Sequence, residues 1–268
     1  MPATPRHHSI SSLGAQIGPV IARHMDLLFR DVLRGEGVVA DPRFLRYITG
    51  EPHPFGNFAI ISDSADPSAT EAAIEPLRRC GAPAAALHLG PVAAAVEERL
   101  AASGFEPHDV MPAMAVEIEH LSPTSLPPGY RLVRIGGGPE GDAWSEAFAV
   151  GYELPRGVAG LFSPTVAGAT TGDDASMQFF AIEKDGRQVC TSLLYLNDGV
   201  AGIYCVSTIP DERGKGLGAH LTSEPLSVAH RLGYRVGVLQ SSPMGHGVYS
   251  RLGFRDFGGL PLHVRLPG

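Results

Sequence analysis

The sequence predicts an α+β fold in which helices cover the faces of a mixed β-sheet. Three apolar segments, 177–183, 187–196 and 200–206, are separated by Lys-Asp-Gly and Asn-Asp-Gly, which are strong hairpin signals. Helix-like and strand-like segments then alternate to the end of the sequence. Of the 268 residues, 44% are hydrophobic, which is enough to form a packed core.

Each element of the second half has a local signal. A β-branched and apolar pattern predicts a strand at 130–135, and Pro139 begins a helix that extends to about Val150. A Gly- and Pro-rich stretch with a short helix follows. Beyond the three hairpin strands we expect a helix at about 217–231, a strand at 235–240, a short helix at 243–252, and two final strands near 254–257 and 261–265. Pro225 lies within the long helix, where we expect a kink or an early end.

The first half repeats this pattern more weakly. We expect helices at about 17–34, 70–80 and 91–103, and strands at 58–62, 84–89 and 111–121. Gly104-Phe105 and Gly253-Phe254, about 150 residues apart, each follow a strand and a helix, which indicates an internal repeat. A cluster of Pro, Ser, Thr and Gly at 121–129 marks a linker. The sequence therefore predicts two domains, 1–125 and 126–268.

Charge and composition argue against several function classes. The first 125 residues carry 9 Arg and Lys against 15 Asp and Glu, and the last 143 carry 12 against 13, so neither half has the basic surface that nucleic-acid binding requires. No apolar stretch approaches ~18 residues and the N-terminus lacks a secretory core, so we expect no membrane span. Three widely spaced cysteines predict neither disulfides nor a metal site and favour the cytoplasm.

The most informative stretch is the loop at 213–219, Arg-Gly-Lys-Gly-Leu-Gly-Ala, between an apolar strand and a helix. Its alternate glycines let a ligand approach the backbone, and a helix N-terminus favours an anion such as phosphate. The P-loop pattern is absent. The dinucleotide pattern GxGxxG/A matches Gly214, Gly216 and Ala219, but it comes late in the chain and the next strand ends at Gln240, not at an acid. A turn without a ligand and a cradle for the pyrophosphate of an acyl-CoA are the other interpretations.

Two motifs resemble those of the GCN5-related N-acetyltransferase (GNAT) family. Its signature (Q/R)xxGx(G/A) is matched by Arg213, Gly216 and Gly218. Its element Nxx(A/G)xxxYxxxGF is matched by Gly245, Tyr249 and Gly253-Phe254, with Ser242 in place of the asparagine. The resemblance covers about residues 130–268. It implies an acyl-CoA N-acyltransferase (GNAT) fold there, preceded by a partial, degenerate GNAT-like domain that lacks a CoA cradle.

The resemblance also implies site residues, with acetyl-CoA as cosubstrate and no metal. Strands four and five should splay apart so that the backbone of Val206 and Thr208 bonds the pantetheine. Tyr249 matches the general acid that protonates the leaving thiolate; a tyrosine packed on a helix face is the alternative. Relatives that act on protein lysines carry a Glu near the position of Gly202, which leaves Glu153 as candidate base or as a solvated loop acid. The expected cofactor-binding residues are Val206, Thr208, Arg213, Gly214, Lys215, Gly216, Leu217, Gly218, Ala219, Ser242 and Tyr249.

We therefore expect an enzyme that moves an acetyl group from acetyl-CoA to the primary amine of a small molecule, by direct attack in a ternary complex. A protein or peptide N-acetyltransferase and a non-catalytic acyl-CoA-binding regulatory module are the alternatives. The acidic first half is expected to support the catalytic sheet, shape the acceptor cleft or provide a dimer surface, so a homodimer is compatible with this role.

Overall fold

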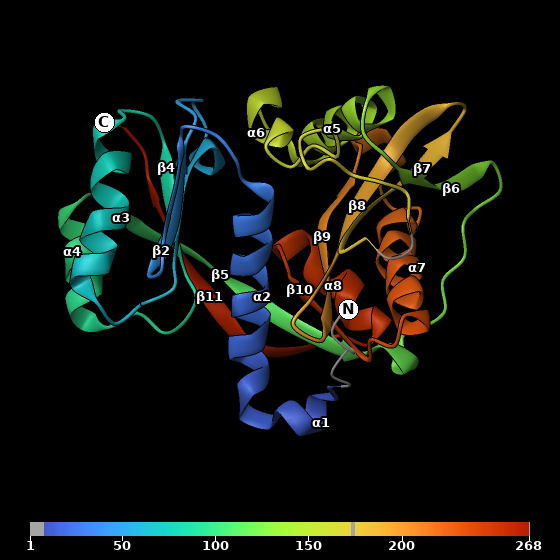
Figure 1. Cartoon of the computed structure of the whole chain (residues 1–268), viewed down its shortest axis with the longest axis horizontal. Helices are drawn as coiled ribbons and strands as arrows, with labels where there is room; N and C mark the ends of the chain where they lie inside the picture. Colours follow the sequence, from blue (N-terminus) through green and yellow to red (C-terminus); the bar gives the residue numbers. More distant parts are fainter. Residues whose placement is uncertain (1–7, 173–174, 268) are drawn as a thin grey trace.

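The computed structural model describes residues 8–172 and 175–267 and is built around one sheet of eleven strands (Figure 1). The strands are β1 (Val38–Asp41), β2 (Phe44–Ile48), β3 (Asn57–Ile61), β4 (Ala84–His88), β5 (Glu106–Glu117), β6 (Tyr130–Ile135), β7 (Met177–Lys184), β8 (Arg187–Asn197), β9 (Val200–Thr208), β10 (Val236–Gln240) and β11 (Arg255–Arg265). They lie in the order β1-β2-β3-β4-β11-β5-β10-β9-β8-β7-β6. Neighbours are antiparallel except for β3–β4 and β9–β10, which are parallel.

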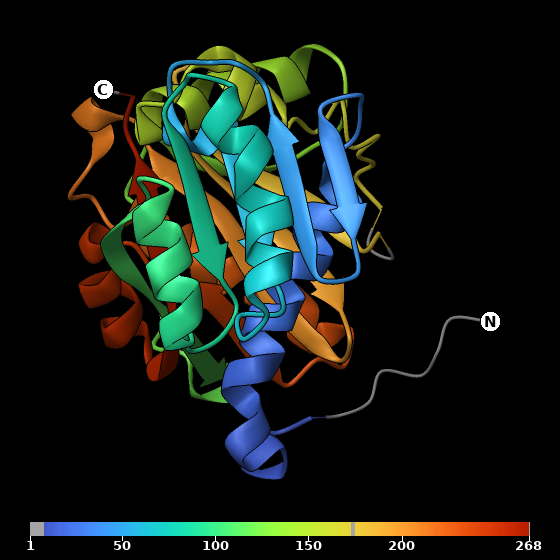
Figure 2. The same ribbon diagram turned by 90° about the vertical axis from the view of Figure 1, so that its left-hand side faces the viewer.

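Helices cover the sheet. They are α1 (Ile10–Leu13), α2 (Ile17–Val32), α3 (Pro67–Arg79), α4 (Ala94–Ala102), α5 (Pro139–Tyr152), α6 (Arg156–Gly160), α7 (Leu217–Arg231) and α8 (Pro243–Leu252). Short 3-10 turns occur at η1 (Gly14–Gln16), η2 (Pro54–Gly56), η3 (Ile118–His120) and η4 (Pro210–Glu212). In Figure 2, α3 and α4 lie side by side on the outer face of the first half. Helix α2 crosses the centre of the molecule and contacts strands of both halves (Figure 1).

Apart from the edge strand β6, the order of the strands is symmetric about the β11–β5 pair. The sequence β1-β2-β3-β4 on one side mirrors β7-β8-β9-β10 on the other, with the same parallel and antiparallel pairings. The two central strands are exchanged. Strand β11 of the second half pairs with β4, and β5 of the first half pairs with β10. The internal repeat predicted from the sequence is therefore present, but each half completes its sheet with the last strand of the other.

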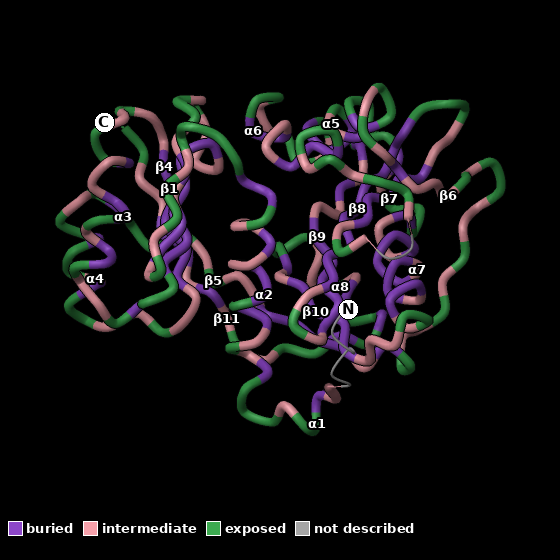
Figure 3. Tube along the Cα trace, viewed as in Figure 1, coloured by how far each residue is buried: buried purple, intermediate pink, exposed green. Residues whose placement is uncertain are grey.

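The hydrophobic core is shared in the same way. Buried residues follow the central strands, whereas exposed residues lie on the outer helices and loops (Figure 3). The largest apolar cluster joins Leu45 and Phe58 of the first half to Trp144, Phe148 and Phe179 of the second. Because apolar surface buried on folding stabilises at roughly 25 cal/mol per Å², a cluster that spans both halves couples their stability.

Most expected elements are present, and the differences have local causes. Strands β1 and β2 were not predicted. Both are short, with four and five residues, and β1 lies at the edge of the sheet with two of its four residues exposed. The two final strands are one strand, β11, with a register shift between Asp256 and Gly259 where Gly258 adopts φ 128°. Helix α7 continues through Pro225 to Arg231, so the expected early end is wrong.

Both hairpin signals of the second half are confirmed. Asp185 and Gly186 have φ of 51° and 76°, and Asp198 and Gly199 have φ of 49° and 77°. Type I′ turns require a positive φ at both central residues, which Asp-Gly adopts at low cost. These turns set the register of β7, β8 and β9 and so position the end of β9, where the candidate site begins.

Candidate active site

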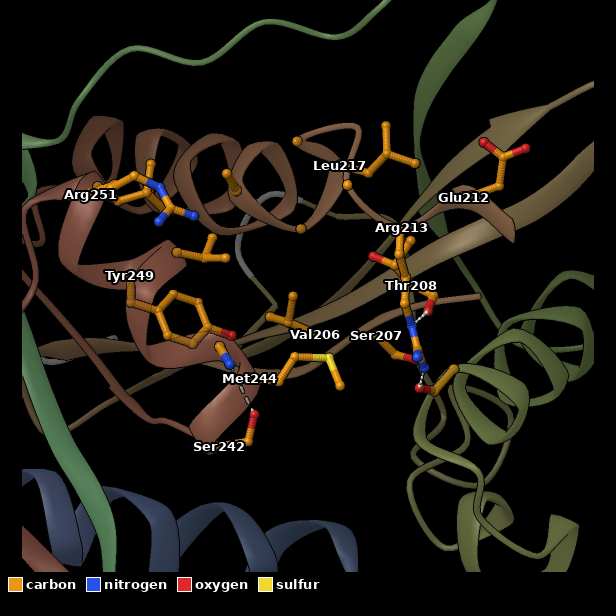
Figure 4. Close-up of a pocket in the computed structure, with 18 of the residues that line it drawn as sticks. Val206, Ser207, Thr208, Glu212, Arg213, Leu217, Ser242, Met244, Tyr249 and Arg251 are labelled. Atoms are coloured by element: carbon orange, nitrogen blue, oxygen red, sulfur yellow. Dashed lines mark hydrogen bonds between the residues drawn. The ribbon is translucent and has the colours of Figure 1, made fainter. Parts of the chain in front are cut away.

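The candidate site begins where β9 and β10 part. Their parallel register extends only over Ala201 and Gly202, opposite Gly237 and Val238, although β9 continues to Thr208. The expected splay between these strands is therefore present. A cleft of about 990 Å³ opens in the gap, and Val206, Thr208, Leu217 and Tyr249 are among its lining residues (Figure 4).

A left-handed residue shapes the strand that forms this edge. Cys205 has a φ of 52°, a conformation that costs a non-glycine residue of order 1 kcal/mol or more, and the register with β8 shifts beside it. Its carbonyl accepts a hydrogen bond from the Thr191 hydroxyl at 2.9 Å. Burial raises the pKa of the Cys205 thiol, so this sulfur stays protonated. The bulge turns the backbone of Val206–Thr208 along the cleft, where both predicted pantetheine contacts lie.

The glycine loop presents free amides to the cleft. Within the described residues, none of the backbone N–H groups of 214–219 donates a hydrogen bond to the protein. Gly214 and Gly216 adopt φ of 77° and 78°, and a side chain at either would meet open space rather than protein. These amides lie at the N-terminus of α7, where the helix dipole favours an anion. The loop thus fits the pyrophosphate of an acyl-CoA.

The two cations of the loop have protein partners. The Arg213 guanidinium donates to the carbonyls of Gly151 at 2.8 Å and Thr208 at 3.2 Å, and so holds the end of α5 against β9. Gly151 has no side chain at this contact, where a Cβ would lie 1.9 Å from the Ser207 hydroxyl oxygen. The Lys215 ammonium donates to Glu212 at 2.6 Å. Within the described part of the chain, the N–H groups that the loop leaves without a protein partner are therefore those of its backbone at 214–219.

Glu212 anchors the outer side of the same loop. It accepts hydrogen bonds from Lys215, Tyr130 and Lys184, which lower the pKa of its carboxyl to about 2. The carboxylate therefore stays ionised at neutral pH and forms ion pairs with both ammonium groups. The sequence motif does not include Glu212 or Tyr130. Only the fold brings β6, β7 and η4 together here.

Tyr249 lies at the inner end of the cleft. It comes from α8, its ring packs edge-on against Phe254 with centroids 5.9 Å apart, and its hydroxyl points into the cleft (Figure 4). The residue is only 9% exposed, and burial raises the pKa of its phenol above the usual value of about 10. Ser242, which replaces the motif asparagine, begins α8 by accepting a hydrogen bond from the Gly245 amide at 3.2 Å.

Two further side chains reach the cleft that the sequence reasoning did not select. Arg251 of α8 lines it (Figure 4), and no ion pair to its guanidinium is found among residues 8–172 and 175–267. Met244 also lines it and is 73% exposed, unusual for a large apolar residue. Met244 and Arg251 are seven residues apart on α8, so both lie on the face of the helix that lines the cleft. The sequence contains this spacing, and it could have been used once the helix was assigned.

Glu153, the candidate base, lies at the rim of the same cleft. Its side chain is 77% exposed and its carboxylate is 3.9 Å from the Arg213 guanidinium. It adopts a left-handed φ of 57° where α5 ends. Its role as base stays a prediction.

The position of Gly202 is filled from the other half of the chain. A Cβ at Gly202 would lie 2.5 Å from Cε1 of His24 and 2.4 Å from Cε2 of Tyr204, so no carboxylate fits here. His24 comes from α2, and its Nδ1 is 2.8 Å from the Tyr204 hydroxyl. Burial lowers the pKa of His24 to about 3, so the imidazole is neutral.

A second recess of about 160 Å³ adjoins the inner end of the cleft. The two share Tyr152, Val206, Gln240 and Tyr249 in their linings. Residues of α2, β2, β3, β4 and β5 line this apolar pocket from the first half, and residues of α5, α6 and β9 line it from the second. The cleft and the apolar pocket therefore meet beside the Tyr249 hydroxyl.

The matching gap is closed in the first half. Strands β3 and β4 pair over four residues each, Phe58–Ile61 with Ala85–His88, where β9 and β10 pair over two. The helix that follows β3 begins with Asp66, whose carboxylate accepts the Ser68 amide at 2.8 Å. An acid already occupies the anion position of that helix.

Comparison with known proteins agrees with this geometry. A sequence model of the acetyltransferase (GNAT) family matches residues 145–254. Residues 145–254 are a GNAT domain. The chain is also similar over nearly its whole length to solved structures: a GCN5-related N-acetyltransferase from Kribbella flavida (20% identity, 93% of this chain and 96% of that one, TM-score 0.62) and one from Sphaerobacter thermophilus (15%, 97% and 94%, 0.58). No functionally curated protein matches the sequence.

The tandem arrangement is also found among solved structures. A tandem GNAT protein from the clavulanic acid biosynthesis pathway covers 99% of this chain with 98% of its own, at 14% identity and a TM-score of 0.56. The GNAT fold thus accounts for both halves of the eleven-stranded sheet. Residues 145–254 match the acetyltransferase (GNAT) family, whose members use acetyl-CoA.

None of the helices in the described residues has the length and apolarity to cross a bilayer. Within 8–172 and 175–267, no three His, Cys, Asp or Glu side chains are grouped as metal ligands.

An acid placed at the N-terminus of α7 should strongly weaken acetyl-CoA binding without harming the fold. A Cβ at Gly218 makes an ordinary contact, 3.5 Å from Cγ1 of Val206, and a carboxylate in the first turn of α7 favours the helix dipole. We expect Gly218→Asp to weaken acetyl-CoA binding by at least about 100-fold, a loss of ~2.7 kcal/mol, through repulsion of the phosphates. Calorimetric titration measures this.

Gly218→Ala is the matched control, because it adds the same Cβ without the charge. We expect it to keep acetyl-CoA affinity within about threefold, a difference of ~0.65 kcal/mol, and both variants to unfold at or above the wild-type Tm. Equal affinity of the Asp variant and the wild type would place the phosphates elsewhere.

Proposed function

We propose that the protein transfers an acetyl group from acetyl-CoA to the primary amine of a small molecule in a ternary complex. The observation that carries this proposal is the meeting of two recesses beside one buried hydroxyl. The CoA-sized cleft begins at the free amides of 214–219 and ends at Tyr249, where the apolar pocket begins. A donor and an acceptor bound on the two sides have their reacting atoms at this junction.

The chain's own residues then have distinct roles. The amides of 214–219 and the backbone of Val206 and Thr208 position the donor, which lowers the entropic barrier to attack. The Tyr249 hydroxyl stays protonated and donates to the sulfur as the carbon–sulfur bond breaks. The nitrogen of the acceptor attacks the carbonyl carbon of the thioester. Its surplus proton passes either to the ionised Tyr249, which restores the phenol, or through water to Glu153, in which case solvent reprotonates Tyr249.

The apolar pocket supports a small acceptor over a folded protein. It has a volume of about 160 Å³ and is lined from both halves, including η2 and α6. A recess of this size holds one side chain or one small molecule. A buried site of this kind also favours the neutral, reactive form of an amine, because burial disfavours the charged form.

The test combines binding with turnover. We expect acetyl-CoA to raise the Tm, and release of free thiol from acetyl-CoA to increase on adding primary amines. Stabilisation by acetyl-CoA without thiol release for any amine would favour the regulatory module. Release only with peptides would favour the peptide N-acetyltransferase.

A further inference from the structure

The lining of the apolar pocket carries no charged side chain among the described residues. Five of the chain's 11 phenylalanines and four of its 7 tyrosines line it, although aromatic residues make up only 7% of the sequence. The phenylalanines are Phe29, Phe55, Phe58, Phe148 and Phe162. An aromatic concentration of this kind favours an apolar guest with a flat face.

The polar atoms of the lining are largely engaged with the protein. The Tyr47 hydroxyl donates to the Phe55 carbonyl at 2.8 Å, and the Tyr204 hydroxyl lies 2.8 Å from Nδ1 of His24. The Gln240 amide donates to the Ile21 carbonyl at 3.2 Å. A guest with many hydroxyls or a second charge would lose its water here without gaining partners, at a cost of several kcal/mol.

The position of the pocket identifies which reactant it serves. The donor enters from the cleft, because the free amides at 214–219 lie there. The acceptor nitrogen must reach the same junction, and the apolar pocket is the recess that meets the cleft beside Tyr249. An acyl chain long enough to fill the pocket would exclude the acceptor from it.

Resting on the acyl transfer proposed above, we propose that the apolar pocket binds the uncharged body of the acceptor, a group of about the size of a phenyl ring. The acceptor class is therefore an arylalkylamine or an equally apolar amine, not an amino acid, polyamine or amino sugar. The pocket's volume of about 160 Å³ matches this size. An engineered apolar cavity of ~150 Å³ in another protein binds benzene. The pocket is built jointly by both halves, so the first half selects the acceptor.

A matched pair of acceptors tests whether the pocket excludes a second charged group. 2-Phenylethylamine and phenylalanine have the same ring and amine, but phenylalanine adds a carboxylate. With acetyl-CoA as donor we expect kcat/KM for 2-phenylethylamine to exceed those for phenylalanine, spermidine and glucosamine by about 100-fold or more, since each of these carries a group that the pocket leaves unpaired. Equal or better turnover of the polar amines would overturn the proposal and leave the acyl transfer itself intact.

A pair of Phe→Ala variants tests whether the acceptor binds in the apolar pocket. Phe29 is half-buried, with its ring edge-on to Phe162 at 5.2 Å between centroids. We expect Phe29→Ala to raise KM for 2-phenylethylamine about 10-fold or more and to leave the Kd of acetyl-CoA unchanged. Phe257→Ala is the control, because Phe257 is also half-buried but lines neither recess. Equal effects of the two variants would contradict the assignment.

Two further measurements distinguish failure of this inference from failure of the proposed function. Calorimetric binding of 2-phenylethylamine without any donor, weakened by Phe29→Ala, would support the pocket even if no acetyl transfer were found. Failure of this binding together with normal transfer to polar amines would overturn the inference alone. If phenylacetyl-CoA were a better donor than acetyl-CoA, and Phe29→Ala affected only that donor, the pocket would serve the acyl group and the inference would be wrong.

Discussion

Residues 126–268 produced alone should show no acetyl transfer and no cooperative unfolding. The reason is the exchange of β5 and β11. Strand β5 pairs with β10 over Val236–Gln240 and with β11 over most of its length, so its removal leaves both strands with an open edge. Unpaired backbone groups and exposed apolar faces of this size favour aggregation over folding. Circular dichroism, thermal unfolding and thiol release from acetyl-CoA measure the effect.

Two controls make this expectation specific. Co-expression of 1–125 with 126–268 should restore a soluble, active complex, because it supplies β5 in trans. In the full chain, Met114→Asp should place an unpaired carboxylate in the buried centre of β5 and destabilise both halves together by about 3–5 kcal/mol. His108→Ala, in an exposed part of β5, should change stability by less than about 0.5 kcal/mol. A stable, active 126–268 fragment would contradict the coupling of the halves.

Tyr249→Phe should lower kcat by about 100-fold or more and leave the Kd of acetyl-CoA within a factor of about two. A positioned general acid contributes roughly 10²–10⁴-fold, and the variant removes only the hydroxyl. The ring contact with Phe254 is retained, so the fold is expected to be unchanged. Steady-state kinetics and calorimetric titration of acetyl-CoA give the two numbers.

The pH profile gives an independent check of this role. Burial raises the pKa of Tyr249, so its hydroxyl remains protonated below pH ~10 and the wild-type kcat should show no loss from its ionisation in that range. Tyr234→Phe is the matched control, since Tyr234 packs beside the same core but lines neither recess. A kcat for Tyr249→Phe within twofold of wild type would remove this hydroxyl from the mechanism.

Much of the second half could be predicted from the sequence because its signals are local. The Asp-Gly turns, the strand at 130–135 and the starts of α7 and α8 depend on a few neighbouring residues, and they lie where expected. The glycine loop and Tyr249 are placed by the same local rules and by their resemblance to the GNAT family. In the first half, β1 and β2 were not predicted although both contain apolar residues, because runs of four and five residues do not by themselves distinguish a strand from a loop. Their pairing, β1 with β2 and β2 with β3, makes them strands.

Other features depend on contacts between distant segments. Arg213 and Lys215 were expected to bind the cofactor, and in the folded chain both also bond to protein groups: Arg213 to the carbonyl of Gly151, 62 residues away, and Lys215 to Glu212, three residues away. Arg251 faces the cleft because α8 packs beside α7. The partner of Lys215 lies within the same loop, whereas spacing along the sequence cannot reveal a partner as distant as Gly151.

The sequence by itself determined the GNAT half, its amide cradle and the candidate acid, since each follows from backbone conformation and short-range spacing. The tertiary structure decided what the first half does. In the first half, β3 and β4 stay paired, so that no gap opens between them. Its strand β5 pairs with β10 of the second half, and its helix α2 packs against Gly202 and lines the apolar pocket. Strand exchange and a pocket lined from both halves depend on burial of apolar surface between segments far apart in the chain, and no local pattern encodes that burial.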